Sequence, residues 1–195
     1  MANVAHYGSP AGELSACIRA VGLADRSDLV KLELAGAPET LAAVVEHGCG
    51  SSLATGGTAE VRGTWWCAAA QDRVVVLAEP ACRAALLTAV QAPGVKVADR
   101  SATWSAIALV GRWAGDVLTA VGAHADARLA PPFGQTAIAG IPVSLLLQSD
   151  RRALLLADAE HTSELWQRIA TAGYEFGLSY VGVEAAVRYA LVDVP

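Results

Sequence analysis

Charge is scarce in this chain of 195 residues. Only 17% of the residues are charged and 54% are hydrophobic, whereas an average soluble domain has about 25% charged residues. A bias toward alanine is one explanation of the apolar surplus, and a buried interface with another subunit is a second; we expect both to contribute. The net charge is −5, and Arg151-Arg152 is the one adjacent basic pair. We therefore expect no nucleic-acid partner.

Long apolar runs and metal-binding spacings are also missing. No stretch approaches the ~20 apolar residues that span a bilayer, and the first seven residues lack the pattern of a signal peptide. The four cysteines form no C-x-x-C pair and the four histidines no H-x-x-x-H. We expect no membrane contact, a cytoplasmic location, free thiols and no metal site.

An internal repeat is the strongest positive signal. The tripeptide Asp-Arg-Ser occurs at 25–27 and again at 99–101, each time followed by an apolar run, a glycine and a helix-like segment. Two copies are too few for a solenoid. They predict one domain over 1–195, made of pseudo-symmetric half-repeats at roughly 10–91 and 95–190. The seam between the halves is the place where we expect a ligand.

The interleaved strands and helices predict an α+β fold. Ser9-Pro10 begins a helix whose apolar stripe runs from Leu14 to Val21, with Gly22 placed to end it. The segment 30–34 alternates apolar residues with Lys31 and Glu33, which predicts a half-buried strand. A hairpin is expected from 65–70 and 74–77, and helices from 38–48, 80–90, 113–121, 163–172 and 183–191.

Several motifs, in this order along the chain, resemble a known family. A helix carrying Glu13 and the turn Ala-Val-Gly-Leu-x-Asp-x-Ser at 20–27 resemble the opening of the glycine cleavage T protein family, and 159–185 resembles a later helix and turn of that family. The segments 99–121 and 134–143 resemble the gamma subunit of heterotetrameric sarcosine oxidase. The resemblance implies a T-protein-like folate-binding fold, here without the family's C-terminal barrel domain, and tetrahydrofolate as cofactor.

The resemblance also implies site residues. Glu60 follows Gly56-Gly57 where the family has an acid near the folate, so it is the candidate catalytic and cofactor-binding acid. Asp150 stands where a second acid lies in a Tyr-Thr-Gly-Glu turn. The last helix carries Glu184 and Arg188 in a degraded form of the family's final signature.

Each candidate has a structural alternative. Glu60 could be a solvent-facing strand residue and Asp150 part of a hairpin turn. Arg188 could bind a carboxylate or stabilise the end of the last helix. Trp66 is a candidate wall for the pterin ring, but it and Trp65 point to opposite faces of a strand, and either could be core packing.

Three functions stay open at this point. The first is a small, gamma-like subunit of a sarcosine oxidase-type or demethylating enzyme complex in one-carbon or methylamine metabolism. The second is a minimal tetrahydrofolate-dependent aminomethyl- or methyltransferase that uses Glu60. The third is a non-catalytic interaction protein that keeps the fold without the ligand. Each expects a protein partner or a homo-oligomer.

Overall fold

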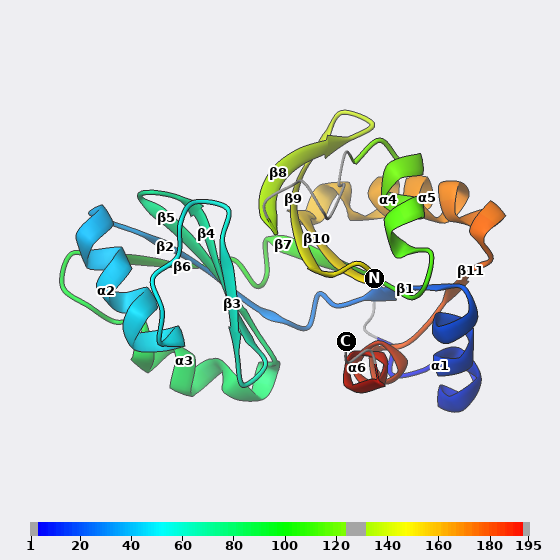
Figure 1. Cartoon of the computed structure of the whole chain (residues 1–195), viewed down its shortest axis with the longest axis horizontal. Helices are drawn as coiled ribbons and strands as arrows, with labels where there is room; N and C mark the ends of the chain where they lie inside the picture. The colour runs from blue at the N-terminus through cyan, green and yellow to red at the C-terminus, as the bar shows by residue number, and fades with distance from the viewer. Residues whose placement is uncertain (1–3, 124–131, 193–195) are drawn as a thin grey trace. The chain divides into compact units, whose positions relative to one another are not determined.

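The computed structural model describes residues 4–123 and 132–192, which form two β-sheets with helices packed on them (Figure 1). The predicted α+β class is confirmed. Contacts divide the chain into two compact units. Unit 1 comprises residues 1–27, 105–130 and 135–195, and unit 2 comprises 28–104 and 131–134. In the described residues, no helix is both long enough and apolar enough to cross a membrane.

Unit 1 is built on a six-stranded sheet in the order β11-β1-β7-β10-β9-β8. Helices α4 and α5 bury their apolar sides on one face of this sheet. Its elements are α1 (Pro10–Arg19), β1 (Val21–Asp25), β7 (Trp104–Val110), α4 (Ala114–Ala120), β8 (Phe133–Ile138), β9 (Ile141–Ser149), β10 (Arg152–Asp158), η2 (Ala159–His161), α5 (Thr162–Gly173), η3 (Tyr174–Phe176), β11 (Leu178–Tyr180) and α6 (Val183–Val192).

Unit 2 is built on a five-stranded sheet in the order β3-β4-β5-β2-β6. Helices α2 and α3 cover one face of this sheet and form a core with its apolar side chains. Its elements are β2 (Val30–Ala35), α2 (Pro38–Cys49), β3 (Thr58–Val61), β4 (Thr64–Ala70), β5 (Arg73–Ala78), η1 (Pro80–Cys82), α3 (Arg83–Ala89) and β6 (Lys96–Asp99).

The two sheets share one strand order. In unit 2 the order is β3-β4-β5-β2-β6, and in unit 1 the strands β8-β9-β10-β7-β1 repeat it, with β11 added beside β1. The first strand of each sequence repeat pairs with the second strand of the other: β1 with β7, and β6 with β2. The half-repeats at 10–91 and 95–190 therefore each hold a full series of elements, but the compact units cut across them. One T-protein-like domain over 1–195 stays a prediction.

The Asp-Arg-Ser repeat at 25–27 is a turn that fastens the end of β1 to β7. The Asp25 carboxylate accepts a hydrogen bond from the Ser27 N–H at 2.9 Å, which closes the turn. The Ser27 hydroxyl then accepts from the Ala106 N–H at 3.2 Å, and the Ala106 carbonyl accepts from the Arg26 N–H at 2.8 Å. Ser27 is thus a turn group, as the sequence predicted.

The repeat at 99–101 makes the same contacts inside unit 2. Asp99 accepts from the Ser101 N–H at 2.9 Å, and the Ser101 hydroxyl accepts from the Lys31 N–H at 3.0 Å. The Lys31 carbonyl accepts from the Arg100 N–H at 2.8 Å. Each copy of the motif follows one strand and bonds to the neighbouring strand that comes from the other repeat. At 25–27 it joins the end of β1 to Ala106 of β7, and at 99–101 it joins the end of β6 to Lys31 of β2.

Two local expectations were wrong. The first helix ends at Arg19, and Val21 and Gly22 belong to β1, where every residue is buried. A strand buried on both faces does not alternate apolar with polar residues. Val21 of this strand therefore matched the helical spacing of the apolar residues before it by coincidence. The strand at 30–35 is not half-buried, because Lys31 is fully buried and Glu33 partly so.

Candidate functional site

A row of four side chains crosses the sheet of unit 2 on the face opposite its helices. Backbone register places Glu60 of β3 beside Trp65 of β4, Trp65 beside Leu77 of β5, and Leu77 beside Lys31 of β2. Neighbouring strands lie about 4.8 Å apart, so the backbones of β3 and β2 at the two ends of the row are separated by roughly 14 Å. Glu60 is exposed, Trp65 is partly buried, and the other two are buried. The row therefore offers an accessible acid beside an indole.

Trp66 lies on the other face of this sheet. It pairs in register with Ala59, is 2% exposed, and packs in the core formed with α2 and α3. A Cβ at Gly48 would lie 2.2 Å from the Trp66 ring, so the helix passes directly over the indole. Trp66 and Glu60 therefore cannot face one ligand from the same side of the sheet, and Trp65 is the tryptophan beside the acid.

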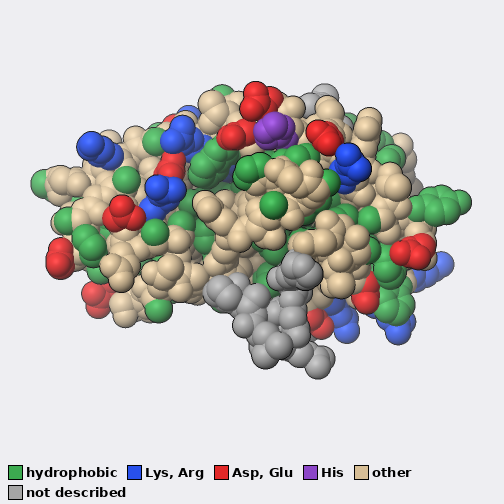
Figure 2. All heavy atoms as spheres, turned by 90° about the horizontal axis from the view of Figure 1, so that it is seen from above, with side chains coloured by type: hydrophobic (Ala, Val, Ile, Leu, Met, Phe, Trp, Pro, Cys, Tyr) green, Lys and Arg blue, Asp and Glu red, His purple; other side chains and the backbone are tan. Residues whose placement is uncertain are grey.

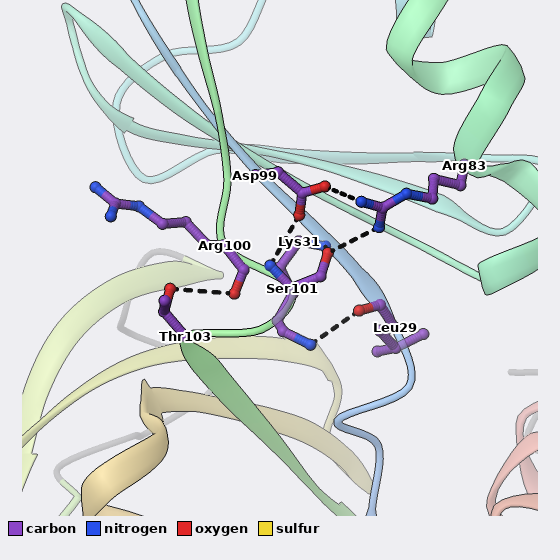
Figure 3. Close-up of polar contacts among 7 residues, drawn as sticks. All are labelled: Leu29, Lys31, Arg83, Asp99, Arg100, Ser101 and Thr103. Carbon is purple, nitrogen blue, oxygen red and sulfur yellow. Dashed lines mark hydrogen bonds and ion pairs between the residues drawn. The ribbon is translucent and has the colours of Figure 1, made fainter.

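Lys31 is the residue that sequence reasoning missed. Its ammonium donates to the Leu29 carbonyl at 2.8 Å, and its side chain has no exposed surface (Figure 3). The alternation of apolar and charged residues along the strand predicted that the Lys31 side chain would be exposed, but side chains on both faces of β2 are buried. A buried lysine is rare without polar partners, and here the Leu29 carbonyl is one such partner at the buried end of the row.

Charged side chains gather around the Asp-Arg-Ser turn at 99–101 of unit 2. Glu33 accepts from Arg100 at 2.8 Å and pairs with Arg73 at 3.4 Å. Arg83 contacts Asp99 and the Ser101 hydroxyl (Figure 3). Burial acts to raise the pKa of the Asp99 carboxyl, but hydrogen bonds from Ser101 and the Arg83 guanidinium together hold it below its ordinary value. Glu33 of β2 thus joins β5 to the residue that follows β6, and the Arg83 pair joins α3 to β6.

The remaining candidates lie in unit 1, Asp150 in a turn and the other two on α6. Asp150 is in the turn between β9 and β10, 81% exposed and 3.9 Å from the Arg151 guanidinium. Glu184 and Arg188 form an ion pair of 2.7 Å along α6. The hairpin-turn reading describes Asp150, and Arg188 binds a carboxylate of its own helix. A ligand role for these three stays a prediction.

Glu13 forms a second polar centre, in unit 1. Its carboxylate accepts three backbone N–H bonds, from Tyr7 at 2.7 Å, Gly8 at 3.0 Å and Gly182 at 2.7 Å. Burial acts to raise the pKa of the Glu13 carboxyl, but these donors hold it below its ordinary value. At Gly182 a Cβ would lie 2.1 Å from the Ala5 carbonyl, so the contact requires glycine. The acid of the opening motif therefore binds the segment before α1 to the start of α6.

We expect Glu13→Gln to lower the free energy of unfolding by about 1–3 kcal/mol at pH 7, because the amide replaces one acceptor oxygen with a donor that faces N–H groups. The native carboxyl has a lowered pKa, so its stabilisation is present above its unfolded pKa of about 4.3 and is lost as pH falls through the folded value. Urea denaturation at pH 7 and at pH 4 measures both effects.

The matched control is Glu175→Gln, an exposed acid of the same unit. It should change the unfolding free energy by less than about 0.5 kcal/mol. A Glu13→Gln variant as stable as this control at pH 7 would contradict the role assigned to Glu13.

The described residues hold no candidate metal cluster, and charges of both signs are mixed on the face drawn in Figure 2. No group of three or more His, Cys, Asp or Glu side chains within 4–123 and 132–192 could hold a metal ion. On the face drawn in Figure 2, basic and acidic side chains are interspersed among apolar and uncharged ones.

Comparison with known proteins identifies the fold. No protein-family model and no curated protein sequence matches the chain. One chain of the heterotetrameric sarcosine oxidase from Corynebacterium sp. U-96, solved in complex with pyrrole 2-carboxylate, matches with a TM-score of 0.63 and 25% identity. That match covers 87% of this chain and 93% of the other.

A second solved structure shares the fold at lower identity. It is the glycine cleavage system aminomethyltransferase T from Bartonella henselae, with a TM-score of 0.73 and 14% identity over 91% of this chain. The match covers 52% of the aminomethyltransferase, so this chain spans about half its length. The resemblance to the T protein and to sarcosine oxidase that the sequence motifs predicted is confirmed in structure.

Proposed function

We propose that this chain is a T-protein-like small subunit of a sarcosine oxidase-type or demethylating enzyme complex, acting in cytoplasmic one-carbon or methylamine metabolism. The observation that carries the proposal is the match to one chain of a heterotetrameric sarcosine oxidase, which extends over 93% of that chain at 25% identity. Near-complete coverage in both directions supports a similar subunit role.

The distribution of exposed apolar side chains supports a partner. All six large exposed hydrophobic side chains in the described residues belong to unit 1: Tyr7, Ile18, Tyr174, Tyr180, Leu191 and Val192. Two of them are tyrosines whose rings lie 6.4 Å apart, Tyr7 and Tyr180. Exposed aromatic and aliphatic side chains on one unit are typical of an interface.

We expect the chain to self-associate or to bind a partner subunit through unit 1. Sedimentation velocity at micromolar concentration should give a mass above that of the single chain, either alone or after co-expression with any amine-oxidising enzyme subunit that a neighbouring gene encodes. The double variant Tyr174→Glu and Leu191→Glu should shift that species toward the single chain, because charge is unfavourable in a desolvated interface. A purely monomeric chain in both samples would contradict the proposal.

A folate is the ligand we propose for the row on the sheet of unit 2. Glu60 and Trp65 fit a folate because they are neighbours on one face of the sheet, and a flat heterocycle binds against an indole beside a polar anchor. When bound, tetrahydrofolate would supply the carrier for a one-carbon unit. Glu60 would accept hydrogen bonds from the ligand's amine or ring N–H groups, and Trp65 would exclude water from one side of the ring.

We expect tetrahydrofolate to bind the chain and Glu60→Gln to weaken it about tenfold or more. A charge-assisted hydrogen bond contributes roughly 1.5–3 kcal/mol, and the exposure of Glu60 places the effect at the lower end. Calorimetry under reducing conditions measures it, on the chain alone and on any complex recovered with a partner. Trp65→Ala should weaken binding as well, whereas Glu46→Gln, an exposed acid on α2, should not.

The outcomes separate the parts of the proposal. Absence of tetrahydrofolate binding in both samples would reject folate as the ligand. The subunit role would then be tested by the sedimentation experiment alone. Binding that Glu60→Gln leaves unchanged would keep the ligand and reject this acid. Transfer of a one-carbon unit by the chain alone would favour the minimal transferase instead.

A further inference from the structure

A groove of about 550 Å³ lies in unit 2, away from the row on the opposite sheet face. It is bounded by the end of α2, the turn between β3 and β4, and α3. Its apolar lining comes from Val61, Trp66, Ala85, Leu86 and Ala89, with Trp66 as a buried floor. This volume lies within the usual range for small-molecule sites, about 300–1,000 Å³.

Two basic side chains, Arg62 and His47, line this groove, and no acidic residue is among its described lining. Within 4–123 and 132–192, neither makes an ion pair or a side-chain hydrogen bond. A guanidinium beside an apolar wall is a preferred partner for a carboxylate, which it can bind through two parallel N–H bonds. The groove thus combines an apolar lining with unneutralised positive charge.

The equivalent groove of unit 1 provides an internal comparison. It is formed by α4, the turn between β8 and β9, and α5, with a volume of about 810 Å³. Its one arginine, Arg168, is paired with Glu164 at 3.3 Å, and Ser163, Gln167 and Thr171 make its wall polar. Because the strand order is the same in both units, the difference between the two grooves comes from their side chains.

The backbone turn presents Arg62 in an uncommon conformation. Arg62 has φ 52° and Gly63 φ 75°, and in the other unit Ala139 has φ 51° and Gly140 φ 84°. Two successive residues with positive φ form the two-residue hairpin turn that favours Asn-Gly. The strain belongs to the turn of both units, but only in unit 2 does its first position carry a cation at the mouth of an apolar groove.

We propose that this groove binds a small amphipathic carboxylate, whose apolar part lies along Leu86 and Ala89 above Trp66 and whose carboxylate pairs with Arg62. This site is separate from the proposed folate position, which lies on the other face of the same sheet. Charge complementarity decides the class of ligand: Arg62 is a cation and no acidic residue is among the described lining, so a carboxylate is favoured over an amine of the same shape.

Two thiols make the groove directly observable. Cys49 and Cys82 both line it and are partly exposed, and the Cys49 thiol donates to the Ser51 carbonyl at 3.3 Å. A ligand in the groove should shield both from alkylation. The probe is decanoate, below its micelle concentration, with decanol and decylammonium as matched compounds of the same chain length.

Decanoate should slow iodoacetamide labelling of Cys49 and Cys82 together, followed by mass spectrometry, and decylammonium should not. Arg62→Asn should raise the decanoate concentration needed for half-protection about two- to fivefold, because Arg62 is exposed. Asparagine tolerates positive φ, so this variant keeps the turn. Ala85→Trp should fill the groove and remove the protection, and Arg168→Asn in the other unit should change nothing.

Equal protection by decanoate and decylammonium, or unchanged decanoate protection in Arg62→Asn, would overturn the proposal. So would the absence of protection in the native chain. Because Arg62 is in an exposed turn, its variant tests the proposal even if Ala85→Trp does not fold.

Discussion

Alanine at position 111 should lower the free energy of unfolding by about 3 kcal/mol or more, because two penalties act together. Gly111 has φ 134°, a conformation that side chains rarely adopt, and its added Cβ would lie 2.5 Å from the Cys17 carbonyl and 2.6 Å from the Ala20 carbonyl. Backbone carbonyls cannot rotate away as a side chain would. Urea denaturation followed by tryptophan fluorescence and by circular dichroism measures the change.

Two other glycines separate these penalties. Gly122 has φ 79° with nothing within 4 Å of an added Cβ, so Gly122→Ala should show conformational strain alone, about 1–2 kcal/mol. Gly134 has ordinary φ and open space, so Gly134→Ala should be nearly neutral. Equal effects at positions 111 and 122 would show that the close approach to the Cys17 and Ala20 carbonyls adds nothing.

The repeat could be read from the sequence because its signals are local. An Asp-Arg-Ser turn, a strand, a glycine and a helix follow each other within about 25 residues, and both copies fold in that order. The exchange of β1 and β6 could not be read, because strand pairing is long-range. Nothing near Val21 indicates that β1 will pair with β7, which begins more than 80 residues later.

The candidate site shows the same division. The sequence indicated that Trp65 and Trp66 face opposite ways, and this follows from strand geometry alone. Only the register with β3 shows that Glu60 shares a face with Trp65 rather than Trp66. For Lys31, alternation predicted exposure, and the prediction failed because burial of the second face depends on tertiary packing. Spacing along one strand carries no information about that packing.

In the native chain, two of the four thiols should react with a disulfide reagent at pH 8, and the other two should react only after unfolding. Cys17 and Cys67 have no exposed surface, whereas Cys49 and Cys82 are partly exposed. Burial raises the pKa of the Cys17 thiol to about 12 and also raises the pKa of Cys67. Since the thiolate is the reactive form, the pKa alone slows Cys17 by about a thousandfold relative to an ordinary thiol.

The same two thiols make stability depend on alkaline pH. Both favour the neutral form in the folded chain, so their contribution is fully present below the unfolded pKa of about 8.5 and decreases as pH rises toward the folded value, near 12 for Cys17. The free energy of unfolding should therefore fall above about pH 8.5, by up to about 1.4 kcal/mol per pH unit for each thiol. Urea denaturation at pH 7.5, 8.5 and 9.5 measures the slope.

Paired variants assign this slope to the buried thiols. Cys49→Ala with Cys82→Ala should remove the fast-reacting thiols and leave the alkaline slope unchanged. Cys17→Ala with Cys67→Ala should keep two fast-reacting thiols and flatten the slope, because no buried thiol remains to ionise on unfolding. If the second pair leaves the slope as steep as in the native chain, the alkaline loss of stability arises from other groups and the buried thiols are not its cause.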